Sequence, residues 1–318
     1  MSEQEWTLVE TPTASSLYDV VVDGGEAYAT GSDGLVLAYE GDGWEPIVEE
    51  GPRNEGNSLY GVDVTADGER VWFVGSSGTV GEYDVVADEL HEHQVGDFRN
   101  AHNDVAVTGH GGAANVYVVD ASGYVHYSLA NGEEGTWRHV RPGTGAELTG
   151  IDFCGERRGF AADDDGAVYA TEDGEKWDAS LVGTDVTLYS TVCRQPGETR
   201  PERQEEDEEG EDATDVESEP EVVETEVEDV WVSGDGKVCH YDGVQWRVDD
   251  HGSSSINDVD CDQTETLGVA GGGRVFDLEE SGELTEEETP TGETLNGVAV
   301  GAFDVAVGAS GVVIQKEN

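Results

Sequence analysis

A short apolar strand pattern recurs along the chain at intervals of roughly 40 residues, a period typical of repeat architectures. Each copy starts with a bulky residue, has a polar or aromatic residue second, and continues into a Val-rich run. Short β-branched runs bounded by turn residues are typical of strands. The copies start at Leu17, Leu59, His102, Leu148, Leu188, Ile256 and Leu295. This strand signature predicts seven structural repeats.

Each signature is followed by a second apolar run, a tight turn and a third apolar run. The turns close on a glycine preceded by Asp, Ser or Gly, a pair that permits the positive φ of hairpin turns. These glycines are Gly34, Gly78, Gly123, Gly166, Gly236, Gly273 and Gly311. A fourth run often carries a tryptophan, as at Trp44, Trp137, Trp177 and Trp246. Seven units of four short strands predict an all-β, seven-bladed β-propeller with four-stranded antiparallel blades.

The two ends of the chain support this count. The repeat that begins at Leu295 lacks a fourth run, and Trp6 near the N-terminus stands in a matching context. We therefore expect the N-terminal strand to pair near Val312–Ile314 and to complete the last blade, which would remove an exposed sheet edge. An immunoglobulin-type sandwich would not show a sevenfold repeat, and a linear solenoid would need capping units. The prediction is one propeller domain over residues 1–318.

The fifth repeat is longer than the others because of an insertion at residues 197–229. The segment is rich in Asp and Glu and contains no aromatic residue, so it cannot bury enough apolar surface to fold alone. We expect a disordered loop between the first and second strands of blade five. Two interpretations remain open: a solvated insertion suited to high salt, or a tail that mimics nucleic acid or docks on a basic partner.

The net charge of the chain limits the classes of partner that it can bind. The chain has 72 acidic against 15 basic residues and a net charge of −57. Such a surface repels nucleic acid and anionic lipid, so neither is an expected partner. The acidic, Lys-poor composition resembles the proteins of salt-in halophilic archaea, and we expect the fold to loosen in dilute buffer. The N-terminus shows no secretory signal and no stretch is long and apolar enough for a membrane span, which predicts a cytoplasmic monomer with reduced cysteines.

The segments EDVWVSGDGKVCHYDGVQW and YATGSDGLVLAYEGDGW resemble BNR/Asp-box type propellers, especially the photosystem II stability/assembly factor-like branch. The resemblance covers essentially the whole chain and implies the propeller fold. It also implies that TEDGEKW in blade four is a structural turn, tied by Thr171 and Asp173, with Gly174 in the turn and Trp177 packed inward. The branch further implies a partner held by an arginine patch, whereas this chain is poor in arginine.

No catalytic residue, metal ligand or cofactor is predicted. Sialidases of this superfamily need three arginines that clamp a carboxylate, and the signatures bring no such set together. Arg138, Arg141, Arg157 and Arg158 could at most form an anion-binding cluster. Cys154, Cys193 and Cys261 occupy nearly equivalent repeat positions. They are interpreted as small buried apolar residues, with a metal site as the alternative.

The second signature position is the candidate binding site, because all seven residues there are polar or aromatic. The ring comprises Tyr18, Tyr60, Asn103, Thr149, Tyr189, Asn257 and Asn296. Inner strands line a propeller's channel, so these side chains would surround one mouth, where they could hold a peptide or sugar. The alternative is that they satisfy backbone groups at strand ends. Asp19, Asp104 and Asp258, one residue further on, could add a cation site.

Two functions follow. The first is a non-catalytic scaffold, like an assembly factor, that binds a protein at a channel mouth. The second is a glycan-binding protein or sialidase-like glycoside hydrolase. An arginine cluster with paired carboxylates at one mouth would favour the second function.

Overall fold

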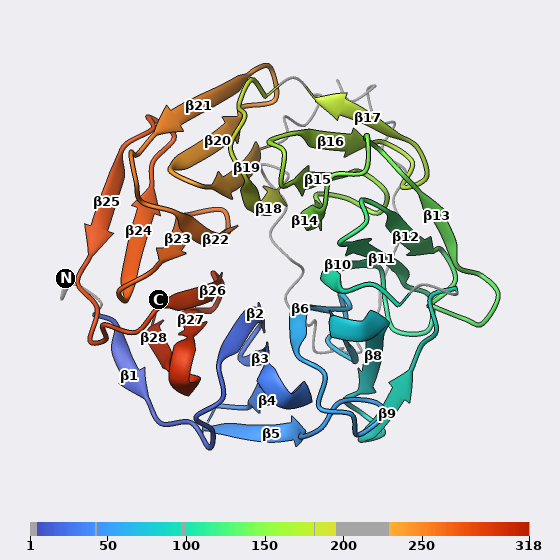
Figure 1. Ribbon diagram of the computed structural model, residues 1–318. Helices are drawn as coiled ribbons and strands as arrows, with labels where there is room; N and C mark the ends of the chain where they lie inside the picture. Colours follow the sequence, from blue (N-terminus) through green and yellow to red (C-terminus); the bar gives the residue numbers. More distant parts are fainter. Residues whose placement is uncertain (1–4, 42, 97–98, 181, 195–228, 318) are drawn as a thin grey trace, which may run out of the picture.

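The computed structural model describes residues 5–41, 43–96, 99–180, 182–194 and 229–317. Within these ranges the strands form seven four-stranded antiparallel sheets, arranged as blades around a central axis (Figure 1). The predicted seven-bladed propeller is confirmed. The innermost strand of each blade begins at the first residue of a strand signature.

The first six blades take their strands in chain order from the axis outward. Blade one contains β2 (Leu17–Asp23), β3 (Glu26–Gly31), β4 (Val36–Tyr39) and β5 (Trp44–Val48). Blade two contains β6 (Leu59–Val64), β7 (Arg70–Gly75), β8 (Thr79–Asp84) and β9 (Glu89–Glu92). Blade three contains β10 (His102–Thr108), β11 (Asn115–Asp120), β12 (Val125–Ser128) and β13 (Arg138–Val140).

Blade four contains β14 (Leu148–Phe153), β15 (Gly159–Asp163), β16 (Val168–Thr171) and β17 (Trp177–Ser180). Blade five contains β18 (Leu188–Arg194), β19 (Asp229–Gly234), β20 (Lys237–Tyr241) and β21 (Trp246–Asp250). Blade six contains β22 (Ile256–Cys261), β23 (Thr266–Ala270), β24 (Arg274–Leu278) and β25 (Leu284–Glu287). Short 3-10 turns η1 (Ser32–Gly34), η2 (Ser76–Gly78) and η3 (Ala309–Gly311) close three of the hairpins.

The seventh blade joins the two ends of the chain. It contains β26 (Leu295–Ala299), β27 (Phe303–Gly308) and β28 (Val313–Glu317), and its outer strand is β1 (Thr7–Val9). Val9 pairs with Val313 and Leu8 with Ile314, as the sequence predicts. Figure 1 shows β1 at the rim beside β28. The ring is therefore closed by main-chain hydrogen bonds rather than by a loop.

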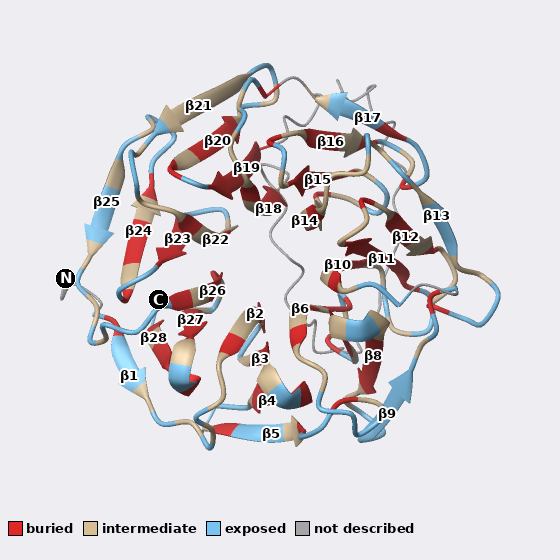
Figure 2. Ribbon diagram, viewed as in Figure 1, coloured by how far each residue is buried: buried red, intermediate tan, exposed pale blue. Residues whose placement is uncertain are grey.

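The core lies between blades, because each blade has two apolar faces. Val36 and Val48 of blade one, for example, form one cluster with Leu59 and Val71 of blade two. Burial is greatest on the second strand of each blade, as in β11 and β19, and falls toward the rim, where β9 and β13 are mostly exposed (Figure 2). None of the described segments forms a helix with the length and apolar character needed to cross a bilayer.

The hairpin turns follow the predicted chemistry. All seven predicted glycines have positive φ, between 68° and 90°. At Gly34 a Cβ atom would also lie 2.5 Å from the carbonyl carbon of Glu50, so a side chain is excluded by both conformation and space. In blade four, Thr171 Oγ1 accepts a hydrogen bond from the N–H of Gly174, while Asp173 Oδ1 accepts from Glu175 and Lys176.

The acidic insertion joins the first and second strands of blade five. Asp229, its last predicted residue, is the first residue of β19 and pairs with Arg194 at the end of β18. The rest of the predicted insertion lies outside the described residues.

Candidate binding site at the channel mouth

A cavity of about 2290 Å³ follows the axis of the ring and is lined by the inner strands. All seven residues of the predicted ring line it. Each is partly exposed, whereas the signature residue before it is buried. The structure thus brings together the residues that the sequence singled out. We refer to them as the mouth ring.

A β-bulge explains why the second signature position faces the channel. In all seven blades the pairing register between the first and second strands shifts at this residue. In blade one, Leu17 pairs with Gly31 but Asp19 pairs with Thr30, which leaves Tyr18 unpaired. A bulge inserts an extra residue and re-aims side chains. It therefore lets residue three face the axis beside residue two, as Asp19, Asp104, Ser190 and Asp258 do.

The three asparagines of the mouth ring clasp neighbouring blades. Asn103 Nδ2 donates to the carbonyl of Leu148 at 2.7 Å. Asn257 and Asn296 donate in the same way to the carbonyls of Leu295 and Leu17, both at 2.7 Å. Each acceptor is the first signature residue of the next blade. These amides satisfy backbone carbonyls, which was the alternative interpretation of the ring.

The tyrosines of the mouth ring form fewer hydrogen bonds with the rest of the fold than the asparagines do. Tyr18 and Tyr60 meet edge to face with ring centroids 5.5 Å apart. The Tyr18 hydroxyl is hydrogen-bonded to Ser32 at 3.1 Å. Within the described chain, no hydrogen bond is formed by the hydroxyls of Tyr60 and Tyr189, so these two rings offer free contact area at the mouth.

Six aspartates line the channel beneath the mouth ring, at the third or fifth signature position. These channel aspartates are Asp19, Asp63, Asp104, Asp152, Asp258 and Asp260. Asp19 accepts one hydrogen bond from the N–H of Val20 and another, at 2.8 Å, from Val62 in the next blade. Asp63, Asp104 and Asp152 repeat this arrangement, accepting from Val107, Ile151 and Cys193 of the following blade. Asp258 and Asp260 accept from Val298 and Val300.

This bonding makes the carboxylates interblade clamps. Sequence reasoning pointed to three of the six as a cation site and missed Asp63, Asp152 and Asp260. Alternation along each strand could have revealed them, because residues three and five of a signature share a face. Among the residues that the structure describes, the oxygens of Asp19, Asp104 and Asp258 do not come close enough together to form a metal-ligand set.

Burial, joined at some positions by the charge of neighbouring carboxylates, raises the pKa values of four channel aspartates. Burial raises the pKa of Asp260 to about 8, and the neighbouring charges of Asp258 and Asp152 add to the effect. Burial likewise raises the pKa of Asp258 to about 6, although a hydrogen bond with Ser190 partly opposes it. The pKa values of Asp19 and Asp104 are also well above the ordinary range, through burial and mutual repulsion. A cation that entered the channel would relieve this repulsion.

Basic residues are scarce in the channel. Among the described residues, Arg194 is the only Lys or Arg that lines it, and its guanidinium is paired with Asp229 at 2.6 Å. Of the predicted anion cluster, Arg158 binds Glu172 at 3.0 Å, while Arg141 donates to the carbonyl of Ser122. The three-arginine clamp of a sialidase is therefore not assembled in the part of the chain that is described.

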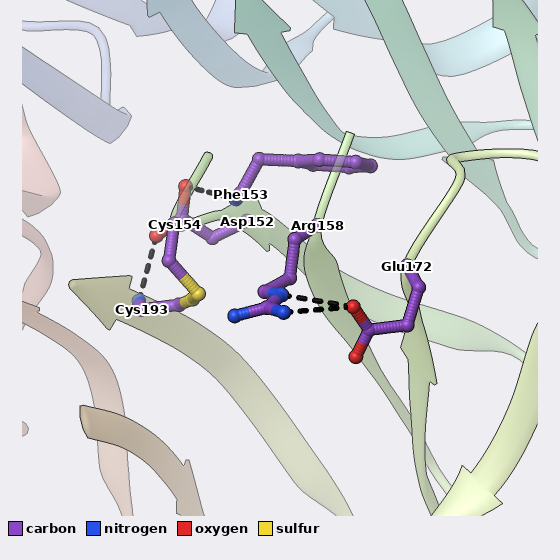
Figure 3. The surroundings of a disulfide bond; sticks show 6 residues. All are labelled: Asp152, Phe153, Cys154, Arg158, Glu172 and Cys193. Atoms are coloured by element: carbon purple, nitrogen blue, oxygen red, sulfur yellow. Dashed lines mark hydrogen bonds and ion pairs between the residues drawn. A yellow bond between two sulfur atoms is a disulfide. The ribbon is translucent and has the colours of Figure 1, made fainter. Parts of the chain in front are cut away.

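The prediction of reduced cysteines is wrong for one pair. Cys154 and Cys193 form a disulfide between blades four and five, with their Cα atoms 5.0 Å apart (Figure 3). The reason lies in strand alternation: Cys154 is two residues after Asp152, which already faces blade five and accepts the N–H of Cys193. The two sulfurs are consequently unavailable to a metal, whereas Cys239 and Cys261 are free thiols.

Comparisons with known proteins support the fold. The structure titled "YCF48 bound to D1 peptide" aligns over 100% of this chain and 96% of its own, with 11% identity and a TM-score of 0.68. YCF48 from Cyanidioschyzon merolae aligns over 98% and 99%, with 16% identity and a TM-score of 0.69. The WD40 propeller domain of Doa1 aligns over 100% and 98%, with 10% identity and a TM-score of 0.72. No family model and no curated protein matches the sequence.

Proposed function

We propose that this propeller is a non-catalytic scaffold that binds a basic segment of a protein partner at the channel mouth. The observation that carries the proposal is the stacking of two layers on one axis. Seven bulges present the mouth ring, and six carboxylates lie directly beneath it. One structure of the same fold was solved with a peptide bound, which supports a peptide as the ligand class.

The mouth supplies contact area and the channel supplies charge. Tyrosine offers a large, stiff surface whose ring face attracts a cation, with each contact worth about 0.5–1 kcal/mol at exposed sites. Below it, an Arg or Lys side chain would meet Asp19 and Asp104, whose pKa values are raised by burial and by neighbouring carboxylates. The positive charge of that side chain would favour the ionised form of both groups. Charge complementarity of this kind selects the partner and suppresses acidic competitors.

The channel aspartates are poorly suited to acid–base catalysis. Both oxygens of Asp19, Asp63, Asp104 and Asp152 already accept backbone N–H groups. A general acid or base needs an oxygen free to reach the substrate. Together with the missing arginine clamp, this favours binding over glycoside hydrolysis.

The test compares a short Arg/Lys-containing peptide with the same peptide carrying citrulline and acetyl-lysine, by fluorescence anisotropy in multimolar KCl. High salt screens the outer acidic surface more than a partly buried channel. We expect the basic peptide alone to bind. The Y60A/Y189A variant should lose about tenfold in affinity, since two cation–π contacts are worth about 1.4 kcal/mol.

The matched control neutralises two glutamates at the outer rim of the propeller. The variant E89Q/E92Q changes exposed residues of β9 and should leave the affinity within about twofold of the parent, because exposed charges contribute little. Equal loss in both variants would show that attraction is a general property of the acidic surface. Equal binding of the two peptides would show that positive charge is not what the protein recognises, and would overturn the proposal.

A further inference from the structure

Three potential metal ligands come together inside blade three. His102 begins β10, Asp120 ends β11 and His126 lies in β12. One ligand atom from each can be chosen so that all three lie within 4.8 Å of one another. All three side chains are buried, with exposures of 0%, 0% and 1%. The set is thus built by adjacent strands and not by a surface loop.

His102 departs from the repeat in a way that packing does not explain. The other six signatures begin with Leu or Ile, which fill this buried position with apolar atoms. Both ring nitrogens of His102 lack a hydrogen-bond partner. Buried polar groups are normally satisfied, and one left without a protein partner at a native position indicates a bound water, a bound ion or a functional role.

Asp120 and His126 are already oriented toward each other. Asp120 Oδ1 accepts hydrogen bonds from the N–H groups of Ser122 and Tyr124, both at 2.9 Å. Its Oδ2 lies 3.0 Å from His126 Nε2. The backbone bonds fix the carboxylate in the hairpin turn, so its second oxygen points at the imidazole pair. The rings of His102 and His126 meet edge to face with centroids 5.5 Å apart.

Blade four contains the same turn without the histidines. Asp163 Oδ1 accepts from the N–H groups of Asp165 and Ala167, and its Oδ2 accepts from the Tyr169 hydroxyl at 2.8 Å. Leu148 stands where blade three has His102. The tyrosine satisfies the carboxylate, and the leucine needs no partner. Blade three has replaced both of these residues with histidine while keeping the aspartate.

We propose that His102, Asp120 and His126 form a binding site for one divalent transition-metal ion. Two imidazoles and one carboxylate suit Zn²⁺, and related ions of the first row accept the same ligands. Three protein ligands leave a remaining position for water. The ion would satisfy His102 and tie the first three strands of blade three together. His102 also directly precedes Asn103, so the ion would steady one member of the mouth ring.

The test needs a protein without a histidine tag, because surface ligands would obscure one internal site. The metal content of the purified protein is measured by inductively coupled plasma mass spectrometry, before and after dialysis against EDTA and after reloading with Zn²⁺. All steps use multimolar KCl, which screens the exposed acidic groups that would otherwise hold divalent ions. Co²⁺ serves as a second probe, since its visible absorption reports the coordination geometry.

Two variants replace the histidines with residues that occupy the equivalent positions in other blades. H102L restores the residue type of the other blades, and H102L/H126Y installs the residues of blade four. Both retain every acidic residue of the parent chain. We expect the parent to hold one Zn²⁺ per chain and its melting temperature to rise by about 5 °C at a Zn²⁺ concentration 100 times Kd. H102L/H126Y should fold, bind no Zn²⁺ and show no shift.

Two results would overturn the site. One is a parent protein whose melting temperature and metal content do not respond to Zn²⁺ or Co²⁺. The other is equal metal binding by the parent and H102L/H126Y, which would assign the ion to surface carboxylates.

Discussion

Removing the indole of Trp6 tests whether the N-terminal strand really completes the ring. Trp6 is only 5% exposed and packs with Leu267, Val275 and Leu295 of blades six and seven. Its Nε1–H donates to Glu287, and the ammonium of Lys316 lies 5.3 Å from the centre of its ring. Replacing a buried tryptophan with alanine typically costs about 3–5 kcal/mol. At about 2 °C for each kcal/mol, W6A should lower the melting temperature by about 6–10 °C.

The assay is thermal unfolding followed by circular dichroism in multimolar KCl, with L8A as the matched control. Leu8 lies two residues after Trp6, in β1, but it is 60% exposed, so L8A should shift the midpoint by about 1 °C or less. Deleting residues 1–10 should cost more than W6A, because it also uncovers the edge of β28. Equal shifts for W6A and L8A would refute the closure argument.

Three further outcomes follow from the charges and the disulfide. Transfer from multimolar KCl to dilute buffer should loosen the fold, seen as loss of the circular dichroism signal, because a net charge of −57 is then unscreened; an unchanged spectrum would contradict this. Reduction should destabilise the parent by about 4 kcal/mol, as expected for a crosslink closing a loop of this size, and should leave C154S/C193S unchanged. Between pH 6.5 and 8 the melting temperature should fall as pH rises. The pKa of Asp260 is about 8 in the folded state, whereas an unfolded Asp has a pKa near 3.9, so the folded state binds more protons in this pH window. D260N should flatten the dependence of melting temperature on pH. A melting temperature that rises with pH would contradict this reasoning.

The fold could be predicted from the sequence because each repeat contains its own alternation of apolar strands and its own turn residues. The signature at Leu17 predicts where β2 begins, and Asp33–Gly34 predicts the turn after β3. Ring closure was predictable too, since Trp6 restores the residue that the last repeat lacks. These are local features of the sequence. Because the pattern occurs seven times, an ambiguous strand or turn in one repeat can be assigned from the other six.

The site was predictable only in part, because its chemistry depends on how neighbouring blades meet. The mouth ring could be located, since the second signature position is polar or aromatic throughout. The clasp from Asn103 to the carbonyl of Leu148 could not be foreseen, as it joins residues of different blades. The same holds for the disulfide of Cys154 and Cys193. The cluster around His102 requires the register of three strands, although the histidine itself is visible as a departure from the repeat.

Photo-crosslinking shows directly where on the propeller a basic peptide binds. A basic peptide with a photoreactive residue is bound to the protein in multimolar KCl, irradiated, and the adducts are mapped by mass spectrometry. We expect adducts at the mouth ring, around Tyr60 and Tyr189, and their loss in Y60A/Y189A. Adducts spread over the exposed outer strands β9 and β25, with none at the mouth, would contradict this expectation.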